Sequence, residues 1–209
     1  MYVKEIWRYP VKSLKGEEVA STRIDETGIE GDRLVYVAGG GRVITSRTHP
    51  ALLALRGTLG SDGEARVEGD SWSDPRALER VRAVAGPQAQ LLRAPSGAFD
   101  VLPLSVATDG TVEYLGIDRR RLRPNIVIGG VDGLDERQWP GQRLLIGEVS
   151  IHVSRLRPRC VMTTWDPDTQ ERDSSVLRRI VRELDGSAAL DCAVEQAGTI
   201  EVGATVRLA

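Results

Sequence analysis

Apolar and polar positions alternate in short runs along most of the chain, and glycine or proline turns separate these runs. Residues 32–46 predict a hairpin around Gly39–Gly41, and residues 51–69 predict a second hairpin that turns at Ser61–Gly63. Further strand patterns occupy residues 1–11, 123–130, 142–156 and 198–209. Many short strands with glycine-rich turns favour barrels over a parallel doubly wound sheet.

Helical periodicity is confined to three segments, which are residues 73–86, 108–116 and 173–186. In the first, Asp74 or Ser73 can cap the helix, Pro75 suits its first turn, and Gly86 ends it. Thr108 is the expected cap of the short second helix. The third segment predicts one apolar face made of Leu177, Ile180, Val181 and Leu184.

These patterns predict a mainly β chain with a few helices, an α+β protein with two barrel-like units. The segment "APSGAFD", residues 94–100, is the softest stretch near the middle of the chain. We therefore expect an N-terminal unit at residues 1–95 and a C-terminal unit at residues 96–209. The two units could also share one core.

Composition and charge exclude some classes of function but do not identify a particular one. The chain has 209 residues, a formal net charge of −2, and a pI near 5.8, so no global excess of positive charge points to nucleic acid or an anionic membrane. No apolar run approaches the ~20 residues that span a bilayer, and no signal peptide is visible. We expect a soluble cytoplasmic protein with reduced thiols that binds neither nucleic acid nor a membrane.

The stretch "RLRPRCVMTTWDPDT", residues 155–169, contains Cys160, one of only two cysteines. Arg157 and Arg159 beside it favour the thiolate, which is the form that binds metals. The alternative is that Cys160 is an inert buried side chain, as most free cysteines are. We expect that role for Cys192. The sequence does not exclude a disulfide between the two cysteines.

The two histidines, His49 and His152, are expected to be structural. A cysteine-nucleophile hydrolase would need one of them as a base beside Cys160. No CxxC pair or histidine-rich cluster suggests a zinc site.

Several polar side chains interrupt strand-like segments near strand ends. Guanidinium groups bind phosphate and carbonyl oxygens in bidentate fashion, so these side chains would suit an anionic ligand if they converge. The ordinary alternative is that each pairs with a nearby acid or faces solvent. The candidate residues are Lys12, Ser13, Arg33, Arg47, Arg123, Asn125 and Arg159.

The order of the motifs resembles that of MOSC proteins, a family named for the C-terminal domain of molybdenum-cofactor sulfurase. The motifs are "WRYPVKSLKGEEV", "GDR", "TSRTHPALLAL", "RPNIVIGG", "DERQW", "RCVMTTWDPDT" and "GTIEVGATVRL". They resemble most the branch with an N-terminal MOSC β-barrel domain, which includes the mitochondrial amidoxime-reducing component and bacterial relatives. The resemblance implies a MOSC N-terminal β-barrel unit followed by a MOSC β-barrel domain.

This resemblance implies a mononuclear molybdenum site with a pterin dithiolene cofactor. Cys160 matches the family cysteine that ligates molybdenum, and it would be the catalytic residue. Glu136 and Trp139 match an "E-x-x-W" element that we interpret as structural. Family descriptions also include pyridoxal phosphate binding, which we attach to no residue. The implied cofactor-binding residues are Lys12, Ser13, Arg33, Arg47, Thr108, Thr111, Arg123, Asn125 and Arg159.

The chain departs from the family pattern close to the expected metal site. Arg157 and Pro158 stand where family members often have a cysteine or another small residue, and Trp165 replaces a smaller residue. Gln170 stands where glycine is common in the turn that follows. These changes would reshape substrate access and leave substrate choice open.

Three functional hypotheses follow from the sequence. The first is a molybdenum enzyme that removes oxygen from small N-hydroxylated substrates and receives electrons from a separate reductase. The second is a non-catalytic carrier of molybdenum cofactor or of its sulfur. The third is a barrel that has lost the cofactor. The family resemblance favours the first, although the same anion site and thiol would serve the second. The third is the least favoured, because Lys12, Arg33, Arg123, Asn125 and Cys160 all occur in their family motifs.

Overall fold

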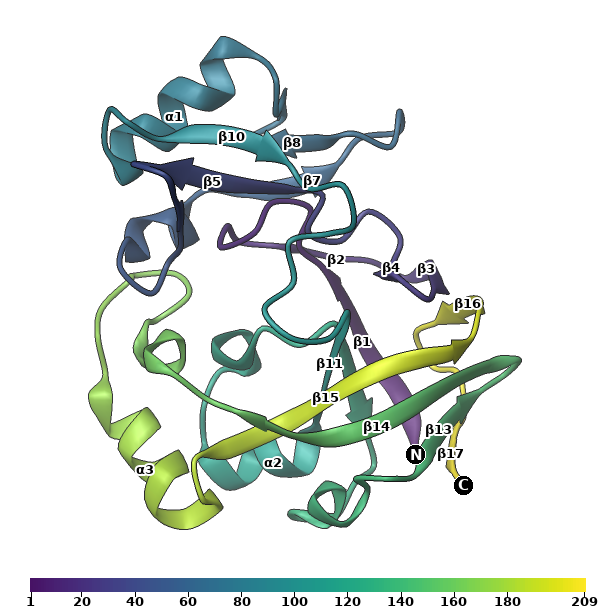
Figure 1. Cartoon of the computed structure of the whole chain (residues 1–209). Helices are drawn as coiled ribbons and strands as arrows, with labels where there is room; N and C mark the ends of the chain where they lie inside the picture. Colours follow the sequence, from purple (N-terminus) through teal and green to yellow (C-terminus); the bar gives the residue numbers. More distant parts are fainter.

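The computed structural model describes residues 1–209, and its largest element is a curled eight-stranded sheet (Figure 1). All neighbouring strands are antiparallel except β11 and β12, which are parallel. In spatial order the strands are β17 (Val206–Leu208), β13 (Arg143–Ile146), β14 (Val149–Pro158), β15 (Ser187–Gln196), β11 (Leu104–Thr108), β12 (Ile126–Gly129), β1 (Tyr2–Arg8) and β2 (Glu17–Glu18).

The two ends of the chain meet in this sheet. A β-bridge joins Tyr2 to Thr205, and the amide of Val206 donates to the carbonyl of Met1 at 3.0 Å. These contacts bring β1 beside β17, so the sheet curls into the barrel-like shape seen in Figure 1. Strand β1 therefore belongs to this sheet even though it opens the N-terminal part of the chain. The boundary between residues 1–95 and 96–209 stays a prediction.

Three small sheets complete the strands. The two that lie with α1 above the barrel in Figure 1 contain both predicted hairpins, β5–β6 and β7–β8. Their strands are β10 (Gln90–Arg93), β5 (Val35–Gly39) and β6 (Arg42–Ile44), and β7 (Gly57–Leu59), β8 (Ala65–Val67) and β9 (Asp70–Ser71). The third sheet consists of β16 (Gly198–Glu201), β3 (Ser21–Asp25) and β4 (Gly28–Ile29).

Three α-helices lie where the sequence predicts them, at Pro75–Ala85 (α1), Asp109–Leu115 (α2) and Ser174–Leu184 (α3). Asp74 caps α1 by accepting from the Arg76 amide, and Thr108 caps α2 by accepting from the Thr111 amide. Four short 3₁₀ helices are η1 (Pro50–Ala54), η2 (Arg119–Leu122), η3 (Asp135–Gln138) and η4 (Val161–Thr164). None of the helices is long and apolar enough to cross a membrane.

The predicted apolar face of α3 is wrong in part. Val181 is 58% exposed, whereas Val176, Ile180 and Leu184 are the buried residues of this helix. These three are spaced four residues apart and form one row along the helix. The row packs with Ala107 and Leu115 in a small core of its own, which turns Val181 outward.

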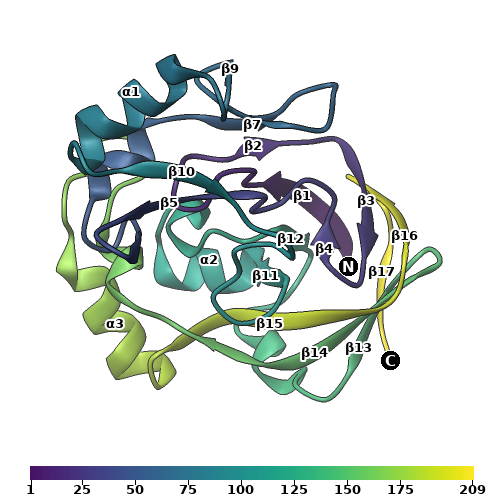
Figure 2. The ribbon, with the colours of Figure 1, turned by 45° about the horizontal axis from the view of Figure 1, so that its top comes forward.

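Two larger cores support the cavity described below. One lies inside the curled sheet and includes Ile6, Val106, Ile126 and Leu190. The other lies between α1 and the small sheets above the barrel. Figure 2 shows β5 and β10 passing over the end of the barrel that β1, β11 and β12 form. The part of the chain that contains α1 and the sheets β10–β5–β6 and β7–β8–β9 therefore covers one end of the barrel.

Replacing the buried valine of β11 tests the barrel core. We expect Val106→Ala to lower the free energy of unfolding by about 2 kcal/mol, because it removes two buried methyl groups and leaves a cavity. Urea unfolding followed by fluorescence measures this change. Val43→Ala on the 52% exposed valine of β6 is the matched control, and an equal loss in both variants would contradict the assignment of the core.

Candidate functional site

A cavity of about 310 Å³ is lined by residues from both halves of the chain. It brings together eight of the ten side chains that the sequence singles out, which are Lys12, Ser13, Arg33, Arg47, Arg123, Asn125, Arg159 and Cys160. The set spans 148 positions of the sequence, from Lys12 to Cys160, so the fold, rather than local sequence, assembles it. The convergence favours a shared ligand over separate surface ion pairs.

Thr108 and Thr111 do not line this cavity. Their hydroxyls both donate to the carboxylate of Glu136, and all three residues are buried. Burial raises the pKa of Glu136. This cluster ties α2 to η3, and Trp139 beside it lies in the barrel core, so the "E-x-x-W" element has structural contacts here.

The cavity carries a large excess of positive charge. Seven cationic side chains and only two carboxylates line it. In a partly buried site such charges repel each other more strongly than in bulk water, which favours an anionic ligand. The cations are Lys12, Arg33, Arg47, Arg123, Arg155, Arg157 and Arg159, and the carboxylates are Asp100 and Asp191.

Asp100 joins two of these cations at the rim. Its carboxylate accepts from Lys12 Nζ at 2.6 Å and from Arg47 Nη2 at 3.0 Å. Burial raises the pKa of Asp100, but the hydrogen bond and charge of Lys12 and the charge of Arg47 outweigh it and hold the pKa below its ordinary value. Lys12 also donates to the carbonyl of Ala98, so the 94–100 segment lies against the cavity.

Behind the cavity wall, the buried carboxylate of Asp32 connects three separate segments. It accepts from the Tyr9 amide at 2.7 Å, from Asn125 Nδ2 at 3.0 Å, and from the Arg33 guanidinium. The Asn125 side-chain oxygen in turn accepts from the Ser105 amide at 3.1 Å. These bonds fix Arg33 and Asn125 relative to each other, although they lie 92 positions apart in the sequence.

Three of the seven non-glycine residues with positive φ are among the same residues. Ser13, Arg33 and Arg123 all have positive φ, at 74°, 52° and 50°. Glycine would adopt these angles without strain, whereas other residues each pay of order 1–3 kcal/mol. The side chains retained at these strained positions all face the cavity, which indicates that the site requires them.

The ring of Tyr9 stands beside two of the arginines. Arg123 Cζ lies 4.2 Å from the ring centroid, and Arg33 Cζ lies 5.1 Å from it. Burial raises the pKa of Tyr9 to about 12, although both arginine charges oppose this. The neutral phenol therefore supports the two guanidinium groups through its π face without neutralising them.

Arg159 has hydrogen-bonding capacity that the protein does not use. Its Nη2 donates to the Leu122 carbonyl at 2.8 Å, but its buried Nε and Nη1 atoms have no partner. Burial, together with the charge of Arg157, lowers the pKa of Arg159 to about 10. Buried donors without partners are rare, so these two atoms indicate an acceptor from a ligand.

Cys160 reaches the cavity from the start of η4. Its carbonyl accepts from the Thr163 amide and hydroxyl, at 3.1 and 3.0 Å, and its side chain is half-buried and free. Neither His49 nor His152 lines the cavity. The thiol therefore has no histidine base beside it, and the geometry does not support a cysteine hydrolase.

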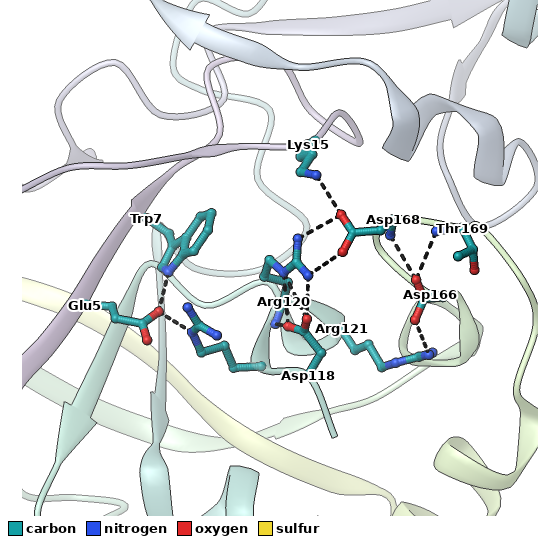
Figure 3. Close-up of polar contacts among 10 residues, drawn as sticks. Glu5, Trp7, Lys15, Asp118, Arg120, Arg121, Asp166, Asp168 and Thr169 are labelled. Carbon is teal, nitrogen blue, oxygen red and sulfur yellow. Dashed lines mark hydrogen bonds and ion pairs between the residues drawn. The ribbon is translucent and has the colours of Figure 1, made fainter. Parts of the chain in front are cut away.

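An ion-pair network holds the turn that follows η4, as Figure 3 shows. Asp168 accepts from Lys15 Nζ at 2.7 Å and from Arg120 Nη2 at 2.6 Å, and the Arg120 hydrogen bonds lower its pKa well below the ordinary value. Next to it, Arg121 Nη2 donates to Asp166 at 2.9 Å. The network connects the segment carrying Cys160 to η2 and to Lys15, which follows β1 in the chain.

A second, much smaller cavity of about 20 Å³ lies behind Met162. Trp165 lines it together with Trp7 and Tyr9. Trp165 therefore forms part of the wall of this second cavity, and its buried indole Nε1 has no hydrogen-bond partner.

The sequence alone predicts no role for four residues that shape the site, namely Tyr9, Asp32, Asp100 and Asp191. The available signals were local: Asp32 directly precedes Arg33, and Asp191 is the one charge in the apolar run "AALDCAV". The hydrogen-bond partners of these residues lie far away in the sequence, so these hydrogen bonds are visible only in the folded structure.

The fold and site define a β-barrel protein with a cationic cavity and one thiol in its wall. The model of the MOSC domain matches residues 81–207, and the model of the MOSC N-terminal β-barrel domain matches residues 1–89. The chain belongs to the MOSC domain family.

Named relatives are similar over most of the chain. Mitochondrial amidoxime reducing component 2 of Rattus norvegicus is 25% identical over 229 residues, which cover 80% of this chain and 67% of the relative. Mitochondrial amidoxime-reducing component 1 of Homo sapiens is 24% identical, with the same coverage of both chains. The chain thus spans about two thirds of the length of these relatives.

Solved structures share the fold at low sequence identity. The YuaD protein of Bacillus subtilis matches with a TM-score of 0.55 and 14% identity, covering 99% of this chain and 94% of that one. A hypothetical protein matches with a TM-score of 0.51 and 14% identity, covering 99% of this chain and 66% of that one. These likenesses concern the fold alone.

Thiol labelling tests the different surroundings of the two cysteines. Cys160 is half-buried in the cavity, whereas Cys192 is buried in the barrel core, where burial raises its pKa. We expect Ellman's reagent to titrate one thiol per native chain and two in denaturant. Cys192→Ala should leave the native value at one, and Cys160→Ala should reduce it to zero. Two fast native thiols would contradict the structure.

A substitution at Asn125 tests the buried polar hub. Asn125→Ala leaves the Asp32 carboxylate and the Ser105 amide each short of a partner, so we expect the free energy of unfolding to fall by about 1–3 kcal/mol. Urea unfolding provides the measurement. Gln142→Ala is the control, because that amide donates to the Gln138 carbonyl at the surface, and a loss as large in the control would refute the hub.

Proposed function

We propose that this protein binds a molybdenum–pterin cofactor in the cavity and reduces small N-hydroxylated compounds. One observation carries the proposal: a free thiol lies in a cavity wall among seven cations and only two carboxylates. A soft thiolate suits molybdenum, and the cations suit a phosphorylated pterin.

The residues present fit such a group. The two unpartnered donor atoms of Arg159 can bind its oxygens, and Arg123 uses none of its donors on protein acceptors while it stacks against Tyr9. The structure contains no cluster of three or more His, Cys, Asp or Glu side chains that could hold a metal ion. A metal at Cys160 would therefore take its other ligands from the cofactor and from solvent.

Each cavity residue would have a distinct role. Cys160 would ligate the metal through its thiolate. Arg33 and Arg123 would hold the phosphate and Ser13 would orient the pterin, while Asn125, whose amide already bonds Asp32 and the Ser105 amide, would position Arg33. Lys12, Arg47 and Arg159 would neutralise its remaining charge. The bound cofactor would supply the two-electron chemistry that removes oxygen from nitrogen. The rigid hub at Asp32 would keep the cations in place without rearrangement.

The names of the relatives support the substrate class. The rat and human proteins are called amidoxime-reducing components, and an amidoxime is an N-hydroxylated amidine. Because these relatives are named as components, we also propose that electrons come from a separate reductase. A cytoplasmic location also remains a proposal.

Metal analysis provides the first test of the cofactor. The chain, Cys160→Ala and Cys192→Ala would be expressed in a host that makes molybdenum cofactor. We expect molybdenum and pterin in the wild type and in Cys192→Ala, and we expect molybdenum to fall at least tenfold in a folded Cys160→Ala. Mass spectrometry and oxidised-pterin fluorescence measure both groups. Equal molybdenum in all three proteins would show that Cys160 is not the ligand.

A turnover assay separates an enzyme from a carrier. We expect the loaded protein to convert benzamidoxime to benzamidine over many turnovers with a chemical or protein electron donor, while its pterin content stays constant. Chromatography quantifies both compounds. Release of pterin to a cofactor-free molybdenum enzyme, with no benzamidine formed, would instead favour the carrier.

A further inference from the structure

A pair of arginines on β14 has binding capacity that the cofactor assignment leaves unused. Arg155 and Arg157 lie near the end of this strand, Arg159 follows one residue beyond it, and all three line the cavity. Arg159 is next to Cys160 in the sequence, and Arg157 and Arg155 lie progressively farther from that cysteine along the chain. The Arg155 side chain is 54% exposed and that of Arg157 is 17% exposed.

A buried carboxylate fixes the outer two arginines. Asp191 lies opposite Arg155 in the β14–β15 pairing, and its side chain is fully buried. Its Oδ2 accepts from Arg155 Nε at 3.1 Å, and its Oδ1 accepts from Arg157 Nη1. One carboxylate thus holds two guanidinium groups, and the cluster of these three side chains keeps a net charge of +1.

Several donors in this cluster are free. Arg155 uses only Nε on the protein, which leaves Nη1 and Nη2, and Arg157 uses only Nη1, which leaves Nε and Nη2. Guanidinium groups held by a carboxylate are well placed to bind a second anion, because little side-chain entropy is lost on binding. The free donors and the net charge match one anionic group.

We propose that Arg155 and Arg157, held by Asp191, form a subsite that selects N-hydroxylated substrates carrying an anionic group, either a carboxylate or a phosphate. This inference rests on the proposed function. Arg159 lies nearest to Cys160 and serves the cofactor, whereas Arg155 lies at the exposed end of the row. The substrate's N–OH group would face the thiol side of the cavity while its anion binds at the mouth.

Two substrates of the same shape test the subsite. 4-Carboxybenzamidoxime carries a carboxylate, and 4-carbamoylbenzamidoxime carries a neutral amide in its place. With the loaded wild type we expect kcat/KM to favour the carboxylate by about tenfold, mainly through KM. The preference should shrink as salt is raised, because the subsite is partly exposed. Equal kcat/KM for these two compounds rules out a carboxylate as the ligand, and it would overturn the proposal if N4-hydroxycytidine and its 5′-monophosphate are also reduced equally well.

Variants of the two arginines test whether they cause the preference for the carboxylate substrate. Arg155→Gln and Arg157→Lys should each reduce the ratio of the two kcat/KM values several-fold, and Arg157→Gln should abolish it. Arg155→Gln provides the test if Arg157→Gln does not fold. Arg143→Gln is the matched control, because Arg143 pairs with Glu195 outside the cavity, and its ratio should equal that of the wild type. Loss of pterin from Arg155→Gln and Arg157→Lys would show that these arginines hold the cofactor instead.

A binding measurement keeps this inference separate from the proposed function. Calorimetry of the loaded protein with both compounds should give a Kd about tenfold lower for the carboxylate. If neither compound is reduced but this difference is present, the reductase proposal fails and the subsite stands. If both are reduced and bound equally well, and the phosphate pair shows no preference either, the reductase stands and the subsite fails.

A second pair of compounds identifies the anion. N4-hydroxycytidine and its 5′-monophosphate differ by one phosphate. Preference for the phosphate alone, for the carboxylate alone, or for both supports the subsite and defines its ligand. Preference for neither overturns it.

Discussion

The cavity depends on one buried carboxylate. Asp32 accepts from the Tyr9 amide, from the Asn125 side chain and from Arg33, and it thereby joins the N-terminal strand, the "GDR" turn and the start of β12. Burying a charge costs several kcal/mol unless it is paired and hydrogen-bonded, and here two of the three partners that offset this cost, Asn125 and Arg33, are themselves cavity residues. Loss of any partner would therefore affect the shape of the site as well as the stability of the fold.

Around this hub the protein holds like charges together. Arg33, Arg123 and Arg159 converge with few acceptors of their own, and Ser13, Arg33 and Arg123 adopt strained backbone angles. Neither the convergence of like charges nor the strained backbone angles stabilise the fold. The stabilising contribution comes from the two apolar cores on either side of the cavity, where burial of apolar area offsets the local cost. Local disagreement with folding preferences is typical of functional sites.

The sequence predicts the elements well where a local rule determines them. The hairpins at Gly39–Gly41 and Ser61–Gly63 and the cap of α1 follow from turn and capping chemistry, and the structure confirms them. The motifs identify the family and eight residues that converge. Asp32 and Asn125 are 93 positions apart, and no local pattern encodes their bond. The α3 face fails for a related reason: periodicity allows two adjacent rows, and the tertiary partner buries the row that contains Val176.

The arginines of β14 show how one strand can divide a cavity between two ligands. Burial increases from Arg155 to Arg157 near the end of the strand, and just beyond it Arg159 has buried donors without partners. Electrostatic interactions strengthen as water is excluded. The inner arginine therefore suits a permanently bound anion, and the outer pair suits one that exchanges with solvent. Asp191 reinforces this division, because it neutralises part of the outer charge and leaves Arg159 without a carboxylate partner.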